Sequence, residues 1–205
     1  DGSSYLTGFT NSFVQSGQQA FLTKFTANGS LSWQRTFQGP ERFTTDEGKG
    51  VAVAPDGSVY VTGQTVGNQG DVLLLKFSPD GSLEWQRRWD GGGAETREAV
   101  AVGSDGAVYV TGGSATLGQF GPLFVLRFAP DGSLVWQRIR SVETGGAVGT
   151  GQGIAVGSDG SIYAAGVSPR PELGDFDMLL LKLDPTGALV WQRTYSSADV
   201  ADARG

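Results

Sequence analysis

The feature that most constrains this fold is a nine-residue phrase that occurs four times. "PDGSLEWQR" at 79–87 recurs as "ANGSLSWQR" at 27–35, "PDGSLVWQR" at 130–138 and "PTGALVWQR" at 185–193. A second phrase keeps the same spacing, as "DGSSYLTG" from 1, "DGSVYVTG" from 56, "DGAVYVTG" from 105 and "DGSIYAAG" from 159. Repetition at a period of about 50 residues indicates an array of equivalent supersecondary units.

Each unit has the pattern of four short strands separated by turn signals. No segment of helical length shows a 3.6-residue period, so the sequence predicts an all-β protein. The third strand of the unit, "DVLLLKF" at 71–77 and "DMLLLKL" at 177–183, does not alternate with polar residues. Both faces of such a sheet are therefore expected to be buried. A four-stranded antiparallel unit that is buried on both faces is typical of a β-propeller blade.

We predict a single β-propeller domain over residues 1–205, with blades at approximately 1–47, 48–96, 97–150 and 151–205. Asp1 aligns with Asp56, so the first blade is expected to lack its innermost strand, which leaves 15 strands. Three arrangements remain open, because propellers typically have 4–8 blades. The chain is a segment of a longer propeller, two copies assemble a ring, or four blades close by themselves. We favour a segment of a larger ring.

Turn chemistry predicts how the strands pair. Asp-Gly and Asn-Gly tolerate the positive φ of a two-residue hairpin turn, so each repeat is expected to hold two tight hairpins. A loop centred on Asp80 and Gly81 places Lys76 opposite Trp85. The same arithmetic predicts one basic–tryptophan pair in each repeat, namely Lys24–Trp33, Lys76–Trp85, Arg127–Trp136 and Lys182–Trp191. We expect a cation–π contact of roughly 0.5–1 kcal/mol within each pair, and expect a three-residue bulged loop to remove it.

These phrases resemble the SBBP-type bacterial β-propeller repeat, in which a "DGSxYVTG" run is followed by "DxxLxKLxxDGxLxWxR". The resemblance covers nearly the whole chain. It implies a secreted or cell-surface bacterial protein, with the periplasm as an alternative, and no established catalytic activity. The chain departs from the pattern where Gln19 and Pro122 stand at the positions of Asp71 and Asp177, and where "YAAG" replaces "YVTG" at 163–166.

Composition limits the chemistry that is open to this chain. It has no histidine, the usual general base and commonest metal ligand, and no cysteine. Its net charge of −6 and pI near 4.6 argue against a nucleic-acid partner, which requires a basic face. No apolar run approaches the roughly 20 residues that span a bilayer. We therefore expect no catalytic residues, no cofactor, no nucleic acid and no membrane span.

The short turns are expected on one rim of the propeller and the longer, variable connections on the other, where binding usually occurs. Glu172, Asp175 and Asp177 are weak calcium candidates, because they lack the D-x-D-x-D-G spacing of a calcium loop. Trp89 and Asp90 beside a glycine run form a candidate ligand loop, in which Trp89 would stack on a sugar. Packing of Trp89 on its own blade is the expected use.

The sequence thus predicts a non-catalytic scaffold that mediates protein–protein or surface interactions, with a protein partner or self-association. Binding of a carbohydrate or small ligand through the variable loops is the alternative. An enzyme fragment with paired carboxylates is the third reading, since propellers host many activities.

Overall fold

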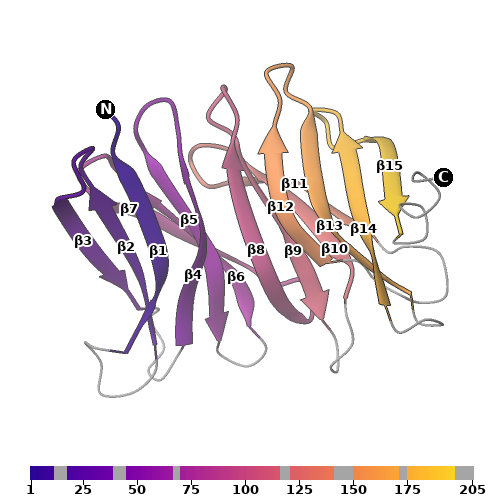
Figure 1. The fold of residues 1–205 in the computed structure, drawn as a ribbon, viewed down its shortest axis with the longest axis horizontal. Coiled ribbons are helices and arrows are strands. Elements are labelled where there is room, and N and C mark those ends of the chain that lie inside the picture. The colour runs from indigo at the N-terminus through magenta and orange to yellow at the C-terminus, as the bar shows by residue number, and fades with distance from the viewer. Residues whose placement is uncertain are drawn as a thin grey trace, which may run out of the picture.

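The computed structural model describes residues 1–11, 18–38, 45–66, 70–115, 121–140, 150–170 and 175–196. Within those residues, 15 strands form one three-stranded and three four-stranded antiparallel sheets. The sheets stand side by side as consecutive blades of an open arc, with β1 near one end and β15 at the other (Figure 1). The all-β prediction, the strand count and the three-stranded first blade are confirmed, and the chain forms a partial β-propeller.

The strands follow the chain order within every blade. Blade 1 contains β1 (Ser4–Thr10), β2 (Gln19–Phe25) and β3 (Leu31–Phe37). Blade 2 contains β4 (Thr45–Val53), β5 (Val59–Val66), β6 (Asp71–Phe77) and β7 (Leu83–Trp89). Blade 3 contains β8 (Ala94–Val102), β9 (Val108–Ala115), β10 (Leu123–Phe128) and β11 (Leu134–Arg140). Blade 4 contains β12 (Thr150–Val156), β13 (Ile162–Arg170), β14 (Asp175–Leu183) and β15 (Leu189–Tyr195).

The first strands of blades 2 to 4 begin at Thr45, Ala94 and Thr150, slightly before the predicted blade boundaries. In each of them a β-bulge separates the apolar run from the residues that precede it. The antiparallel ladder continues across the bulge, which is why these strands are longer than the apolar pattern indicated.

The hairpin turns contain three residues, which corrects the predicted two-residue loops. In blade 2, Gly81 N donates to Ser78 O and Ser78 N donates to Ser82 O, both at 2.9 Å. The loop 79–81 therefore ends in Gly81, whose φ is 84°. The same pair of hydrogen bonds closes the turns at 26–30, 54–58, 103–107, 129–133, 157–161 and 184–188. This is the three-residue hairpin loop with a left-handed third residue.

The predicted basic–tryptophan pairs nevertheless form. Phe77 pairs with Leu83 and Lys76 pairs with Trp85. Glu84 therefore has no cross-strand pairing partner and forms a β-bulge. The bulge restores the register that the longer loop shifted by one residue. The corresponding pairs occur in all four blades. The expectation that a three-residue loop would remove this pairing was wrong.

The "DGS" phrase is explained by hydrogen bonds within the turn. Asp56 accepts from Ser58 N at 2.9 Å and from Ser58 Oγ at 3.1 Å. The bond from the Ser58 backbone N–H holds the pKa of Asp56 below its ordinary value. Asp131 and Asp159 accept the same two donors from the serine two residues on. These repeated aspartates serve the turn, as an Asx-type side chain does.

The hydrophobic core lies between the blades. Val72, Leu74 and Trp89 of blade 2 belong to one buried cluster with Val110 and Phe124 of blade 3. Equivalent clusters lie between blades 1 and 2 and between blades 3 and 4. Blades 2 and 3 are thus buried on both faces, as the uninterrupted apolar strands predicted. No helix long and apolar enough to cross a membrane occurs in the described part of the chain.

Two glycine-to-alanine substitutions separate the cost of backbone strain in the folded protein from the effect of reduced flexibility in the unfolded chain. Gly160 has a φ of 77°, and a Cβ there would lie 3.2 Å from Pro185 Cγ, so Gly160→Ala is expected to lower the free energy of unfolding by about 1–2 kcal/mol. Gly153 has no atom within 4 Å of an added Cβ and no positive φ, so Gly153→Ala is expected to be neutral or stabilising. Urea unfolding of both variants measures the difference, and equal effects would contradict this account of the turn.

Candidate functional site

The repeated basic residue lies over a tyrosine, not over the tryptophan that it was predicted to contact. Lys76 Nζ is 5.9 Å from the centroid of the Tyr60 ring, and Tyr60 pairs with Lys76 across β5 and β6. The Tyr60 ring in turn lies 5.8 Å from the Trp85 ring. The other blades repeat the contact, as Lys24–Tyr5, Arg127–Tyr109 and Lys182–Tyr163. The predicted cation–π partner was therefore wrong, because Lys76 pairs with both Tyr60 and Trp85 and its cation turns toward Tyr60.

The tryptophan is covered by the arginine of its own "WQR" phrase. The Arg87 guanidinium carbon lies 5.1 Å from the centroid of the Trp85 ring. Residues two apart in a strand share a face, which brings these two side chains together. The same contact recurs as Arg35–Trp33, Arg138–Trp136 and Arg193–Trp191.

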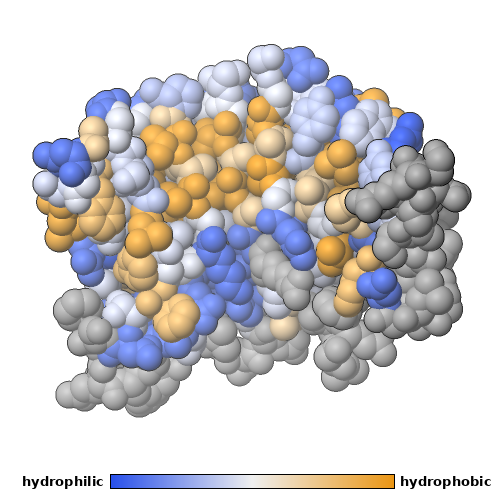
Figure 2. Space-filling model, in the orientation of Figure 1, coloured by the Kyte–Doolittle hydropathy of each residue, from blue (hydrophilic) through white to orange (hydrophobic). Residues whose placement is uncertain are grey.

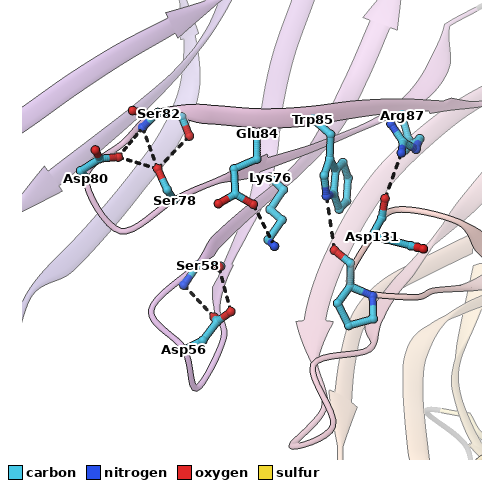
Figure 3. Close-up of polar contacts among 11 residues, drawn as sticks. Asp56, Ser58, Lys76, Ser78, Asp80, Ser82, Glu84, Trp85, Arg87 and Asp131 are labelled. Atoms are coloured by element: carbon cyan, nitrogen blue, oxygen red, sulfur yellow. Dashed lines mark hydrogen bonds and ion pairs between the residues drawn. The ribbon is translucent and has the colours of Figure 1, made fainter.

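In blades 1 to 3 this arginine also binds the following blade, in a contact that we call the interblade clamp. Arg87 Nε donates to Gly132 O at 2.9 Å. Arg87 Nη2 donates to Asp131 O, also at 2.9 Å (Figure 3). Trp85 Nε1 donates to Pro130 O at 3.3 Å. Arg35 binds the backbone oxygens of Gly81 and Asp80, and Arg138 those of Gly187 and Thr186. The clamp explains why the phrase recurs.

Glycine in the third position of the outer turn makes room for the clamp. A Cβ on Gly81 would lie 3.0 Å from the Trp33 ring, and one on Gly187 would lie 3.0 Å from Trp136. A Cβ on Gly132 would lie 2.9 Å from Arg87 Nε. Each of these glycines thus combines a positive φ with close contact to the preceding blade.

Three carboxylates that do not belong to the repeated turns meet at the ends of β6, β7 and β8. Asp71, Asp90 and Glu95 each bring one oxygen within 4.8 Å of the others. Glu95 is buried, accepts from Gly91 N and Ser114 Oγ, and has its pKa raised by burial. Carboxylate oxygens are the ligands that calcium prefers, but Arg88 already binds Asp71 through Nε and Nη2. The protein itself therefore balances part of this charge.

Asp90 was a candidate ligand residue in the sequence, without any connection to Asp71 and Glu95. Asp71 begins β6, Asp90 follows β7 and Glu95 lies in β8 of the next blade, so no local spacing signals such a group. Trp89, the other residue of the candidate ligand loop, is only 8% exposed. Its ring lies 4.7 Å from that of Phe124, and its Nε1 donates to Gln137 Oε1 at 2.8 Å. Trp89 therefore packs against the next blade and offers no open ring face for sugar stacking.

The calcium candidates of the 172–177 loop are only partly described. Asp175 is exposed and accepts from Phe176 N, and Asp177 is half-buried. Glu172 lies outside the described residues, so calcium binding by this loop stays a prediction.

A second polar group lies on the bulges of the first strands. Lys49 of β4 and Gln152 of β12 are the bulged residues, and Glu98 lies within the bulge of β8. Lys49 Nζ lies 3.5 Å from Glu98 Oε2 and donates to Gln64 Oε1 at 3.0 Å. The Glu98 side chain is fully buried, and burial raises its pKa. Figure 2 shows an apolar band across the face formed by β4, β8 and β12, with polar surface below it.

Comparisons with known proteins support the propeller fold. Residues 54–84 match the family described as "Domain of unknown function (DUF5122) beta-propeller". No curated protein matches the sequence. The endo-arabinase of Bacteroides thetaiotaomicron is 12% identical, with a TM-score of 0.52 over 96% of this chain and 77% of that one. A Synechocystis apocarotenoid oxygenase is 12% identical, with a TM-score of 0.51 over 86% of this chain.

These likenesses concern the fold alone, because the identities are low. A protein of unknown function from Bacteroides caccae is 14% identical, with a TM-score of 0.47 over 90% of this chain and 79% of that one. The chain spans 46% of the apocarotenoid oxygenase, which is less than half of its length.

Shortening the clamp arginine tests its contribution to stability. Arg138→Lys removes the planar fork that reaches two carbonyl oxygens, so the free energy of unfolding is expected to fall by about 1–2 kcal/mol. Arg140→Lys is the matched control, since no hydrogen bond joins Arg140's side chain to another described residue. Thermal unfolding of both variants provides the measurement. Equal losses would show that the clamp does not stabilise the arc.

Burial of Glu98 predicts how the free energy of unfolding depends on pH. Because its pKa is raised in the folded state, folded Glu98 binds more protons than unfolded Glu98 above the ordinary glutamate pKa, and stability falls as pH rises through that window. Glu98→Gln is expected to reduce this slope, since Lys49 keeps its bond to Gln64. Urea midpoints across pH measure the slope, with Glu84→Gln as an exposed control. An unchanged slope in Glu98→Gln would contradict the assignment.

Proposed function

We propose that this chain acts as a non-catalytic β-propeller scaffold that binds protein partners through uncovered blade faces. The observation that carries the proposal is the exposure of apolar side chains on the end blades. Met178 of blade 4 is 60% exposed, whereas Val72 at the equivalent position of blade 2 is 1% exposed. Leu6 of blade 1 is 53% exposed, whereas the equivalent Val61 is 2% exposed.

Blade 4 carries three such residues on its outer face, the exposed large apolar side chains Phe176, Met178 and Tyr195, and blade 1 carries Leu6. Contiguous exposed apolar surface marks sites of protein interaction in soluble proteins. A strand face whose side chains are buried in the inner blades and exposed in an end blade is a surface suited to a protein partner.

The use of the repeated polar residues supports a scaffold over a catalyst. The turn aspartates accept hydrogen bonds from their own turns, as Asp56 does from Ser58. The repeated arginines bind the backbone of the next blade, as Arg87 does. These side chains have structural partners, and those contacts account for their recurrence without a catalytic role. The likeness of the repeats to the SBBP type supports a secreted or cell-surface bacterial setting for this scaffold.

Binding of a carbohydrate or small ligand is the second candidate function. It is favoured by Asp71, Asp90 and Glu95, whose oxygens gather within 4.8 Å where the longer connections lie. Carboxylates accept hydrogen bonds from sugar hydroxyls, and variable loops on a rigid scaffold commonly carry binding sites.

Site-specific photo-crosslinking in the source cells tests the proposal. A benzophenone amino acid replaces Leu6, Met178, Asp90 or Ser133 in separate full-chain variants, and adducts are identified by mass spectrometry. We expect protein adducts at Leu6 and Met178 and not at Ser133, which lies in an exposed turn. Adducts confined to Asp90 would overturn the proposal in favour of the second candidate. Blade-face yields no higher than that of Ser133 would overturn it outright.

A further inference from the structure

Blade 4 carries the donor half of an interblade clamp without an acceptor. Arg193 lies over Trp191, with its guanidinium carbon 5.8 Å from the ring, as in the other three blades. Its only hydrogen bond to a described residue is from Nη1 to Gln192 O, at 2.9 Å. Arg138, the equivalent residue of blade 3, makes that same local bond and two further bonds to the next blade. The Nε and Nη2 groups of Arg193 thus have no acceptor among the described residues.

Blade 1 carries the acceptor half without a donor. Its outer turn closes with Gly29 N donating to Thr26 O and Thr26 N to Ser30 O, both at 2.9 Å, and Gly29 has a φ of 82°. This is the backbone geometry of the turns that receive Arg35, Arg87 and Arg138. No described arginine binds the turn of blade 1, however, and nothing described lies within 4 Å of a Cβ on Gly29. The equivalent Cβ positions on Gly81 and Gly187 lie 3.0 Å from a tryptophan.

The apolar faces beside these two halves also match. Between blades 2 and 3, Val72 and Trp89 join Val110 and Phe124 in one buried cluster. The corresponding residues of blade 4 are Met178 and Tyr195, which are 60% and 47% exposed. The residues of blade 1 that correspond to Val110 and Phe124 are Leu6 and Phe21. The outer faces of the two end blades therefore carry the two sides of an interface that the chain already forms three times.

We propose that blade 4 of one copy of this chain docks on blade 1 of a second copy, with Arg193 bound to the carbonyl oxygens of Asn28 and Gly29 and Trp191 packed against Gly29. The two surfaces differ, so the contact is head to tail. Two arcs of four blades close into a ring of eight, which lies within the usual size range of propellers. The proposal rests on the proposed function, because it names the partner of the uncovered blade faces.

Sedimentation velocity of the 205-residue chain across a range of concentrations tests the assembly. We expect a dimer of twice the 21.4 kDa chain mass. Arg193→Ala and Gly29→Asn are each expected to yield monomers. Asparagine tolerates a positive φ, and its side chain meets open space in its own chain but occupies the place of the incoming Trp191. Unchanged thermal unfolding of both variants at low concentration shows that each monomer is folded.

A control variant and a mixture separate docking from loss of fold. Arg138→Lys weakens a clamp inside the chain, so it is expected to lower stability while the mass stays dimeric. Arg193→Ala retains an intact blade 1 and Gly29→Asn an intact blade 4, so a mixture of the two is expected to form a mixed dimer through one contact. Native mass spectrometry identifies this dimer by a mass equal to the sum of the two variants, which neither variant alone gives.

Two outcomes would overturn the inference. One is an unmodified chain that stays monomeric at every concentration, and the other is a dimer that neither variant disrupts. If the chain is monomeric but a different protein is crosslinked at Met178, this inference fails while the proposed function stands. If no adduct forms at either blade face and the chain is monomeric, both fail.

Discussion

Burial of each sheet against its neighbour is the interaction on which the rest of this structure depends. The third strands are apolar on both faces, as Leu73 and Leu74 show by being 3% and 1% exposed toward opposite sides of blade 2. A single blade cannot cover such a strand. The interblade clamp adds direction to this packing, because Arg87 reaches backbone oxygens whose positions are set by the shape of the next turn. The clamp arginine of one blade thus binds backbone oxygens of the next blade and does not require particular side chains there.

Because apolar packing and the interblade clamp hold the blades together, residues at other positions can differ between blades. Lys49, Glu98 and Gln152 occupy bulges in the first strands of three blades, yet they are a cation, an acid and an amide. Asp71, Asp90 and Glu95 gather where blade 2 meets blade 3. Bulges and connecting loops interrupt the ladder without weakening the packing between sheets, so chemistry can vary there at little cost to the fold. The repeated residues describe the scaffold, and the residues that do not repeat are where specificity is to be sought.

The sequence predicted the fold and the strand register correctly, but it predicted the wrong packing partners for several side chains. The register of Lys76 opposite Trp85 was correct although the loop was three residues long, because a bulge at Glu84 compensates for it. The expected cation–π pair was wrong because Tyr60, on the other neighbouring strand, lies at the same level as Lys76. Trp89 was expected to pack on its own blade and packs instead on Phe124 of the next one. Both of these contact errors concern which of two neighbours a side chain turns toward, and periodicity does not contain that information.

The sequence by itself determined the repeat unit, the order and number of strands, the sites of the turns and the three-stranded first blade. These properties depend on residues close together in the chain, such as Asp56 and Ser58 within one turn, and local chemistry is visible in a sequence. Only the tertiary structure decided where the "WQR" arginine goes, which carboxylates meet, and which apolar side chains of the described residues are exposed. Arg87 and Gly132 are 45 residues apart, and the oxygens of Asp71, Asp90 and Glu95 come together across two blades. Such contacts depend on how the sheets stack, which is set by the packing of whole faces rather than by any local pattern.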